Sequence, residues 1–389
     1  MNATKYGALL DTLKNEILSG KYRSNFPFPS VRALISRFKL SDRTVRHALD
    51  ELYAQGLISR KQGRGTFIRS VSRKIGLIVP GIADSEFFQT IVPGLLRSCQ
   101  AVGYQPVFCE ITETAPRERM RQALGFARAL VADRVAGVIF QPMVTLARVD
   151  ANAAVAQCLS NGRIPFVLLN TDFVVSPERS AYDVVGIDNV EAGCMVGAHL
   201  ISCGARRIAF LMWPDVASVR SRFRGLRLSV LDENVKTRLV EANPSNNAAI
   251  ARTLRLFKPD AFVCGNDTAA AVLTQTLARL GRRVPDDVLL AGFDDIRHST
   301  IMTPQLTSVR QPCEDIARIA IARLLLRIAN PSEIPQTIRL PAPLVVRAST
   351  TRSSVKSAKP NQKMEIMKLL RDRQGTVRLS KCGRRKADA

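Results

Sequence analysis

Apolar side chains recur at helical spacing in three segments near the start of the chain, and each stripe predicts an amphipathic helix. Ser30 and Ser41 directly precede the second and third of these segments, and serine is a preferred N-cap residue. Only Lys39 and Leu40 lie between the second segment and the second capping serine, so these two helices must be joined by a tight turn. The stripes occupy residues 6–17, 31–38 and 45–52.

The stretch GLISRKQGRGTF, residues 56–67, follows the third predicted helix. Its apolar pairs predict two short strands, and its glycines allow the basic loop between them to turn tightly. Helical spacing alone fits a three-helix protein-interaction module as well as a helix-turn-helix. A helix-turn-helix followed at once by a basic hairpin is a winged helix, whose second helix enters the major groove of DNA. A phosphate-binding loop does not fit, because the motif G-x-x-x-x-G-K-[ST] is missing and no helix follows Gly65.

Residues 75–350 have a different rhythm, in which short apolar runs alternate with longer helical stretches. Continuous Val, Ile and Leu runs of this kind predict parallel strands that are covered by helices on both faces. About ten such units exceed one comfortable sheet, so we expect an α/β fold with two Rossmann-like lobes and a cleft between them. Ligands of open α/β sheets bind beyond the carboxyl ends of the strands. The polar residues predicted at those ends are Asn170, Asp188, Asn189, Asn266, Asp267, Asp294 and Asp295.

The formal net charge of +24 is concentrated at the two ends of the chain. Residues 1–74 hold 15 Lys and Arg against 5 Asp and Glu, and residues 351–389 hold 12 against 3. The 276 residues between them hold 30 against 25. Basic ends around a nearly neutral middle indicate a nucleic-acid partner or, as the alternative, an anionic membrane surface.

The stretch SGKYRSNFPFPSVRALISRFKLSDRTVRHALDELYAQGLISRKQGRGTFI resembles the DNA-binding domain of GntR-family bacterial transcription regulators, and the resemblance covers residues 5–69. It implies contacts to DNA phosphates, to bases at the start of the recognition helix, and to the minor groove from the wing. The family usually carries Arg after the capping serine, where this chain has Asp42. A carboxylate there favours the helix dipole but repels phosphate, so we expect an altered operator. The implied DNA contacts are Arg32, Ser41, Arg43, Thr44, Arg46, Gln62, Gly63 and Arg64.

The segments VVGIDNVEAGCMVGAHLISCGARRIAFL, FVCGNDTAAA and VPDDVLLAGFDDIRHSTIMTPQLTSVRQPCEDIARIA are similar to the effector domain of LacI-type repressors and periplasmic sugar-binding proteins. The similarity implies a small-molecule effector, most simply a sugar. By the resemblance, a phenylalanine ring would stack on the sugar, Arg222 would donate to its oxygens, and Asp267 would accept from its hydroxyls. Asn170 stands where an acidic residue is common. The implied effector contacts are Ser85, Phe87, Phe88, Asn170, Arg222 and Asp267.

Each of these positions also has a structural interpretation. The pairs Asp188-Asn189 and Asp294-Asp295, which follow predicted strands, fit inter-strand turns or the hinge between lobes, since Asp and Asn are favoured in turns. Arg222 lies among other arginines, so a solvated surface position is its alternative. Phe87 and Phe88 are adjacent, so at most one of them comfortably faces a cleft from a helix.

Residue sets for catalysis or metal binding are missing from the sequence. The chain has 3 histidines and neither G-x-S-x-G nor H-E-x-x-H. His199 and Cys203 share a helix face, but two ligands do not close a zinc site. No apolar run approaches the roughly 18 residues of a membrane span, and the first residues lack a signal-peptide layout. We therefore expect a cytoplasmic protein that is not an enzyme and has no cofactor. A sugar-binding transport or chemoreception protein is the alternative.

The order of the segments resembles the arabinose-repressor class of bacterial regulators. We predict a homodimer in which the sensor domains set the spacing of two winged helices on double-stranded operator DNA, and a ligand shifts that spacing. The tail has a composition that disfavours a packed core, so it is expected to be a disordered arm, with added DNA affinity or with no role. The predicted units are a winged helix over 1–70, a linker over 71–74, an effector-binding and dimerisation domain over 75–350, and a basic tail over 351–389.

Overall fold

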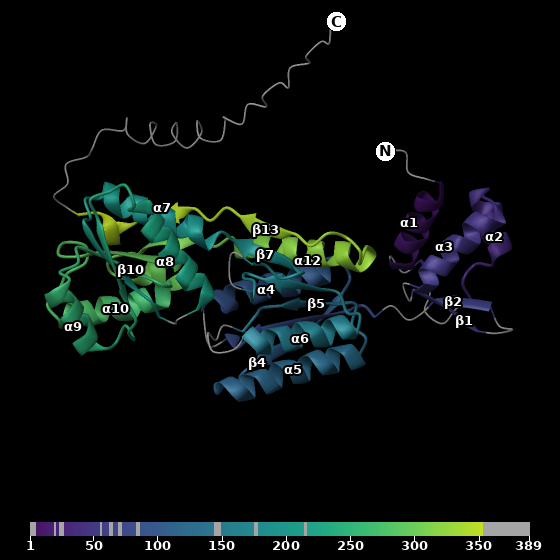
Figure 1. Cartoon of the computed structure of the whole chain (residues 1–389), viewed down its shortest axis with the longest axis horizontal. Helices are drawn as coiled ribbons and strands as arrows, with labels where there is room; N and C mark the ends of the chain where they lie inside the picture. Colours follow the sequence, from purple (N-terminus) through teal and green to yellow (C-terminus); the bar gives the residue numbers. More distant parts are fainter. Residues whose placement is uncertain are drawn as a thin grey trace, which may run out of the picture.

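The computed structural model describes residues 5–18, 21–22, 27–54, 57–61, 65–68, 72–82, 86–143, 149–174, 178–213 and 216–352. Several predicted features lie outside these residues: the wing tip (Gln62, Gly63 and Arg64), the cleft residue Ser85, and the tail beyond Arg352. The described residues form a small N-terminal domain and two α/β lobes, arranged in a row (Figure 1).

The N-terminal domain contains the predicted helices and the two strands of the predicted hairpin. Both serine caps are present: Ser30 Oγ accepts a hydrogen bond from the backbone N–H of Ala33 at 3.2 Å, and Ser41 Oγ accepts one from Thr44 at 3.2 Å. The apolar stripes meet in one core, in which Leu13, Leu34 and Val45 are fully buried. The elements are α1 (Lys5–Leu18), α2 (Val31–Phe38), α3 (Asp42–Ala54), β1 (Ile58–Lys61) and β2 (Gly65–Ile68), with the strands antiparallel.

The first lobe is built on a sheet with the strand order β13-β7-β6-β5-β3-β4, in which neighbouring strands are parallel. Helices α4 and α12 pack on one face of this sheet, and α5 and α6 pack on the other. Its strands are β3 (Lys74–Pro80), β4 (Gln105–Ile111), β5 (Gly137–Phe140), β6 (Phe166–Leu169), β7 (Asp183–Ile187) and β13 (Thr337–Leu340). Its helices are α4 (Glu86–Ala101), α5 (Pro116–Ala132), α6 (Val149–Asn161) and α12 (Cys313–Ala329).

The second lobe repeats this plan with the strand order β14-β12-β11-β10-β8-β9, and within the described strands of this sheet only the pairing of β14 with β12 is antiparallel. Its strands are β8 (Arg207–Leu211), β9 (Lys236–Val240), β10 (Ala261–Cys264), β11 (Leu289–Asp294), β12 (Thr307–Arg310) and β14 (Leu344–Val345). Its helices are α7 (Asn189–Ser202), α8 (Ala217–Ser229), α9 (Asn247–Leu256), α10 (Asp267–Arg279), α11 (Arg297–Ile301) and the short 3-10 helix Ala348–Thr350. The predicted α/β class with two Rossmann-like lobes is confirmed.

The chain passes between the lobes after β7, after β12 and after β13. One hydrophobic core joins them, because the buried residues of α4 and α12 in the first lobe belong to the same cluster as those of α7 and α8 in the second. The two lobes are therefore not independently packed domains. A change in the angle between them must repack a shared apolar surface.

Helices α7 and α8 approach each other unusually closely, and two glycines allow this. A Cβ atom on Gly193 would lie 2.0 Å from the carbonyl oxygen of Arg222, and one on Gly225 would lie 2.0 Å from that of Val190. Real Cβ atoms do not come this close to backbone, so only glycine fits at these positions. The close approach fixes where α8 presents its side chains.

We predict that Gly225→Ala lowers the free energy of unfolding by about 1–3 kcal/mol, because the added methyl group pushes α7 and α8 apart. Gly125→Ala is the matched control in α5, where the added Cβ meets nothing within 4 Å. This control should raise stability by about 0.5–1 kcal/mol through helix propensity. Chemical denaturation of both variants tests the idea, and a Gly225→Ala protein as stable as wild type would refute the tight packing of α7 on α8.

Candidate nucleic-acid interface and interlobe cleft

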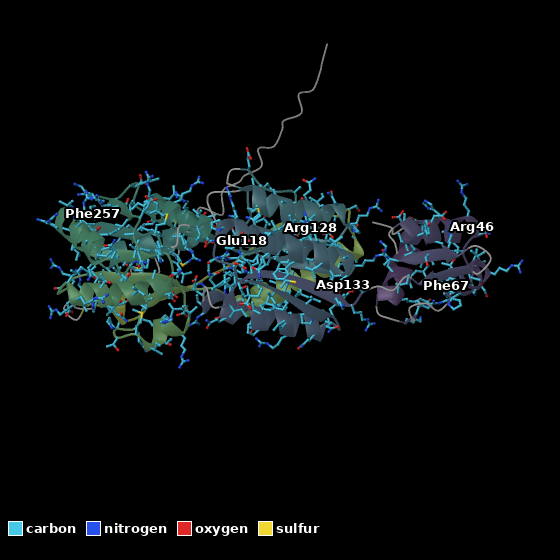
Figure 2. The ribbon with its side chains drawn as sticks, turned by 90° about the horizontal axis from the view of Figure 1, so that it is seen from below. Arg46, Phe67, Glu118, Arg128, Asp133 and Phe257 are labelled. Atoms are coloured by element: carbon cyan, nitrogen blue, oxygen red, sulfur yellow. The ribbon has the colours of Figure 1, made fainter. Side chains whose placement is uncertain are left out.

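The outward face of α3 carries basic and polar side chains at the far end of the molecule. Val45, Ala48, Leu49 and Leu52 point into the core, which leaves Arg43, Arg46 and His47 exposed. Figure 2 shows Arg46 projecting from the N-terminal domain on the side away from the lobes. Arg32 is also exposed, near the start of α2. The predicted recognition helix thus presents the residue types that bind phosphate and base edges.

Asp42, the unusual residue at the start of α3, pairs with Arg46 one turn later. Arg46 Nε lies 2.6 Å from Asp42 Oδ2, and both side chains are more than half exposed. This hydrogen bond raises the pKa of Arg46. An exposed pair of this kind adds little stability, so Arg46 can exchange Asp42 for another acceptor at small cost.

A carboxylate on α1 holds α2 in place. Glu16 Oε2 accepts hydrogen bonds from Arg37 Nη1 and from the Tyr22 hydroxyl, both at 2.7 Å, and Lys21 Nζ lies 2.5 Å from Glu16 Oε1. The Arg37 hydrogen bond is the main reason that the pKa of Glu16 falls to about 2. This ion cluster sets the orientation of the first two helices, and therefore of the turn that leads into α3.

The second candidate site is a cleft of about 380 Å³ between the two lobes. Residues that end or follow strands line it from both sides, as expected for an open α/β fold. The first lobe contributes Pro80, Phe87, Phe88, Arg119, Gln141, Asn170 and Thr171. The second lobe contributes Val216, Ser218, Val219, Arg222, Asn266, Asp294 and Gln311.

Arg222 is the best-connected cation of the cleft. Its side chain is 4 % exposed, which excludes the solvated alternative. Its Nε donates to Asn189 Oδ1 at 2.9 Å, its Nη1 to the carbonyl of Gly265 at 2.6 Å, and its Nη2 to Asp294 Oδ1 at 3.2 Å. The guanidinium also lies over the ring of Phe293, 4.6 Å from its centroid. Arg222 therefore ties α7 and α8 to the ends of two strands.

Among the described residues, three that line the cleft carry a buried side-chain oxygen without a hydrogen-bond partner: Gln141, Asn170 and Gln311. The orientation of two of these amides is fixed by their own donors, since Gln311 Nε2 donates to Asp294 Oδ1 at 2.6 Å and Gln141 Nε2 to the carbonyl of Pro142 at 3.3 Å. Leaving a buried acceptor unpaired costs about 1–3 kcal/mol. The walls of the cleft thus hold acceptors that lack donors.

Asp267 was expected in the cleft, but the structure places it beneath the lining residues. It is fully buried, with Oδ1 accepting from Ser308 Oγ at 2.6 Å and Oδ2 from the backbone N–H of Ile296 at 3.1 Å. Burial, followed by the nearby charge of Asp294, raises the pKa of this carboxyl. Its neighbour Asn266 lines the cleft instead and caps α10, accepting from Ala269 N–H at 2.8 Å.

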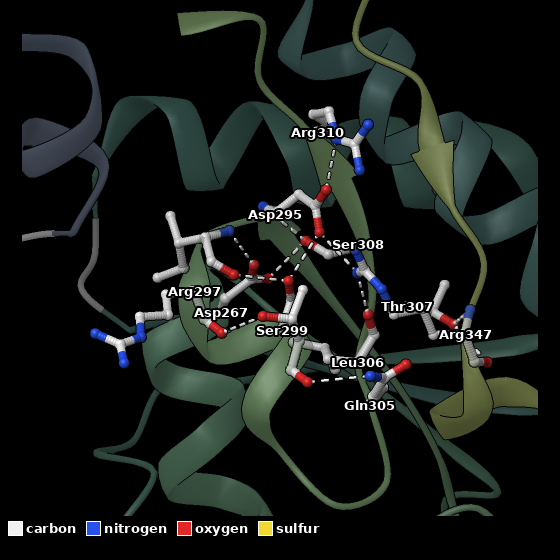
Figure 3. A network of polar contacts seen from close by, with 12 residues as sticks. Asp267, Asp295, Arg297, Ser299, Gln305, Leu306, Thr307, Ser308, Arg310 and Arg347 are labelled. Carbon is white, nitrogen blue, oxygen red and sulfur yellow. Dashed lines mark hydrogen bonds and ion pairs between the residues drawn. The ribbon is translucent and has the colours of Figure 1, made fainter.

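Asp295 also lies inside the second lobe and holds a network that fixes the loop after β11 (Figure 3). Its carboxylate accepts from Ser299 Oγ at 2.8 Å and pairs with Arg310 at 2.6 Å and Arg347 at 2.7 Å. Burial alone would raise the pKa of Asp295, but the two arginines lower it. The structural interpretation therefore fits Asp295, whereas its neighbour Asp294 reaches the cleft.

The pair Asp188 and Asn189 also has two structural roles. Asp188 caps α7 by accepting from the N–H groups of Val190 and Glu191, at 2.9 and 3.1 Å, and Asn189 holds Arg222. Phe87 and Phe88 both line the cleft, although at most one was expected to face it. The two rings are edge to face, with centroids 5.4 Å apart.

The cleft is also lined by residues that were not predicted from the sequence, among them Arg119, Gln141, Ser218 and Gln311. Gln141 and Gln311 each stand between the end of a strand and a proline, in the segments GVIFQP and LTSVRQP. A polar residue at that position was the available signal. Nothing in the local pattern around Arg119 or Ser218 pointed to the cleft.

Within the part of the chain that the structure describes, no three or more His, Cys, Asp and Glu side chains gather closely enough to hold a metal ion. No helix there is long and apolar enough to cross a membrane.

Two segments of the chain match known protein families. Residues 5–68 match the family of bacterial regulatory proteins named gntR, and residues 198–350 match the periplasmic binding protein-like domain. The arabinose metabolism transcriptional repressor of Geobacillus stearothermophilus is 28% identical, over 89% of this chain and 97% of that protein. The ribose operon repressor of Escherichia coli K12 is also 28% identical, over 71% of this chain and 81% of that protein.

Solved structures show the same fold. A cellobiose complex of the transcriptional regulator CelR superposes with a TM-score of 0.62 at 23% identity, over 88% of this chain and 98% of that one. A LacI-family transcriptional regulator from Enterococcus faecium with bound ribose superposes with a TM-score of 0.59 at 22% identity, over 71% and 98%. Both similarities support the two-lobed architecture.

We predict that Glu16→Gln destabilises the N-terminal domain in a pH-dependent way. The folded-state pKa of about 2 lies below the value of about 4.3 for an unfolded glutamate. The stabilisation from the Glu16 carboxylate is therefore fully present above about pH 5 and is lost as pH falls from there to about 2. At pH 7 the variant should therefore unfold more easily than wild type, and the difference should vanish near pH 2. Calorimetry of the first unfolding transition measures this. A difference that stays constant with pH would contradict the assignment.

Proposed function

We propose that this chain, a transcription regulator that joins a GntR-family DNA-binding domain to a periplasmic-binding-protein-like domain, is a repressor whose effector is a free pentose, with arabinose as the first candidate. Two relatives named arabinose metabolism transcriptional repressor, at 28% and 26% identity, match about nine tenths of the chain and support this choice. The chain would bind operator DNA without the sugar and release it when the sugar enters the cleft.

The observation that carries the proposal is the set of unpaired acceptors in the cleft. The oxygens of Gln141, Asn170 and Gln311 need hydrogen-bond donors, and a sugar presents several hydroxyl groups close together. The rings of Phe87 and Phe88 supply the apolar surface on which the face of a sugar ring packs. A cleft of about 380 Å³ is near the lower end of the roughly 300–1,000 Å³ range of ligand sites, so a single sugar ring suits it.

Arg222 and Asp267 have different proposed roles, because Arg222 lines the cleft and Asp267 is buried beneath it. Arg222 shares its donors between internal partners and the cleft, so it both orients Asp294 and meets the sugar. Asp267 acts through the residues that it positions, namely Asn266 beside it and the loop that begins at Ile296. We retain Ser85 as an effector contact on the strength of the resemblance alone.

The DNA contacts follow the exposed face of the N-terminal domain. Arg32 and the first turn of α3, with Ser41, Arg43 and Thr44, are proposed to bind phosphate and base edges. Arg46, which pairs with Asp42 in the free protein, is proposed to release Asp42 and to bind a phosphate or base acceptor of the operator instead. The wing residues Gln62, Gly63 and Arg64 are proposed to reach the minor groove.

A homodimer would place two such domains on two half-sites. Its support is the exposed apolar surface at the edge of the first lobe, where Val102 is 44% and Phe108 37% exposed. Phe108 lies on β4, the edge strand of that sheet. The working compartment is the cytoplasm, where bacterial operators are found.

The experiment that tests the function is fluorescence anisotropy of the full chain on DNA from upstream of its own gene, at fixed salt, titrated with arabinose, ribose, xylose, glucose and hypoxanthine. We expect specific binding that arabinose weakens at least fivefold, the lower end of typical allosteric coupling. Binding that only another sugar or the purine weakens would replace the effector. Binding that none of them alters would refute the proposed pentose control.

We predict that Gln141→Leu weakens arabinose binding by about tenfold, because it removes an acceptor that has no internal partner. Stability should change little, since removal of the unpaired Oε1 offsets the loss of the 3.3 Å hydrogen bond from Nε2 to the carbonyl of Pro142. Gln122→Leu is the control: Gln122 Oε1 accepts from the N–H groups of Thr112 and Glu113 at 3.0 and 3.1 Å, and Gln122 is not among the residues that line the cleft. It should lose about 1 kcal/mol of stability and keep its affinity. Calorimetric titration and thermal unfolding measure both effects; unchanged sugar affinity in Gln141→Leu would remove Gln141 from the site.

A further inference from the structure

The N-terminal domain touches the first lobe through a hydrogen bond that bridges 315 positions of sequence. Lys14 Nζ, on α1, donates to the carbonyl oxygen of Ala329 at 3.1 Å. The lysine is 9% exposed, which is unusual for a residue type that is almost always solvated. A buried ammonium group needs such an acceptor, because an unpaired buried charge is strongly unfavourable.

The acceptor is special because of its place in the fold. Ala329 is the last residue of α12, and the final carbonyl groups of a helix have no partner within it. They also carry the negative end of the helix dipole, which attracts a cation. Figure 1 shows this end of α12 directed toward the N-terminal domain. Lys14 therefore completes the end of a helix that belongs to the other domain.

A buried ion cluster fixes this end of α12 to the first lobe. Asp183, the first residue of β7, is fully inaccessible in its side chain and pairs with Arg323 Nε at 2.9 Å and Arg327 Nη2 at 2.7 Å. Arg323 Nη1 also pairs with Glu333 at 2.7 Å, in the segment that follows the helix. The carbonyl that Lys14 contacts therefore moves with the lobe as a whole and not as a loose end.

The opposite end of α12 lies at the cleft. The helix begins at Cys313, two residues after Gln311, which lines the cleft and donates to Asp294. Its 17 residues span about 25 Å at 1.5 Å per residue. One rigid helix therefore runs from a residue of the effector site to the hydrogen bond with the N-terminal domain.

We propose that α12 is the element that transmits the state of the cleft to the DNA-binding domain, and that its C-terminal end is the surface on which that domain docks through Lys14. This inference rests on the proposed function, and it adds the path by which the effector site is coupled to the DNA-binding domain. A sugar that engages Gln311 shifts the start of α12, and the shift changes how the other end holds Lys14. Lys14 is thus a positioning residue, with no contact to sugar or operator.

The test is the coupling ratio, defined as the operator Kd with saturating arabinose divided by the Kd without it. Lys14→Met keeps the length and helix propensity of the side chain but removes the charge, and it should lower the ratio from at least about 5 to about 1. Lys14→Arg keeps a cation of similar reach and should retain most of the ratio. Lys21→Met, which removes a charge that pairs with Glu16 within the N-terminal domain itself, should leave the ratio unchanged.

Arabinose affinity, measured in parallel by calorimetry, separates the possible causes. The proposal expects Lys14→Met to bind arabinose as wild type does while losing the response. A responsive wild type with an equally responsive Lys14→Met variant overturns this inference and leaves the proposed function standing. A similar loss in Lys21→Met also overturns it, because the effect would then follow from charge alone. A wild type that no sugar affects overturns the proposed function and, with it, the route.

Discussion

A buried guanidinium that must be partnered organises the cleft. Arg222 lies in the wall between the lobes with its donors divided among Asn189, Gly265 and Asp294. Each partner comes from a different segment, so satisfying one charge brings the start of α7 and the ends of β10 and β11 to the same place. The close approach of α7 and α8 delivers Arg222 to that point. Removing any partner would leave a buried charge short of acceptors, which is costly.

The need to pair buried polar groups also explains why the acidic and amide residues of the cleft have different roles. Asp294 accepts hydrogen bonds from Arg222 and Gln311 at the cleft surface. Beneath that surface, Asp267 accepts from the backbone N–H of Ile296, and Asp295 pairs with Arg310. The amide oxygens of the first lobe have no such internal partners. The second lobe is therefore preorganised, and the acceptors that remain unpaired in both lobes are the ones that a polyhydroxylated ligand can satisfy.

Much of this arrangement was predictable from the sequence, and the misses have physical reasons. The short apolar runs of residues 75–350 that predicted strands form β3 to β8 and β10 to β12, because buried parallel strands are continuous hydrophobic segments. The strands β9, β13 and β14 were not predicted, and all three lie at the edges of their sheets. Charged residues such as Lys236 in β9 and Arg339 in β13 interrupt the apolar runs of these strands. The polar residues that follow predicted strands correctly indicated where the cleft lies. The sequence could not show that Asn266 lines the cleft while the adjacent Asp267 is buried beneath it. That choice depends on which of two adjacent residues caps α10 and which turns inward.

Binding linkage provides the most direct test of an effector-controlled repressor. If arabinose weakens operator binding, then operator must weaken arabinose binding by the same factor. We would measure the arabinose Kd by calorimetric titration of the free protein and of the protein saturated with operator DNA. The account predicts a Kd at least fivefold higher in the DNA complex, equal to the factor by which arabinose raises the operator Kd. Equal affinities in the two titrations would contradict it.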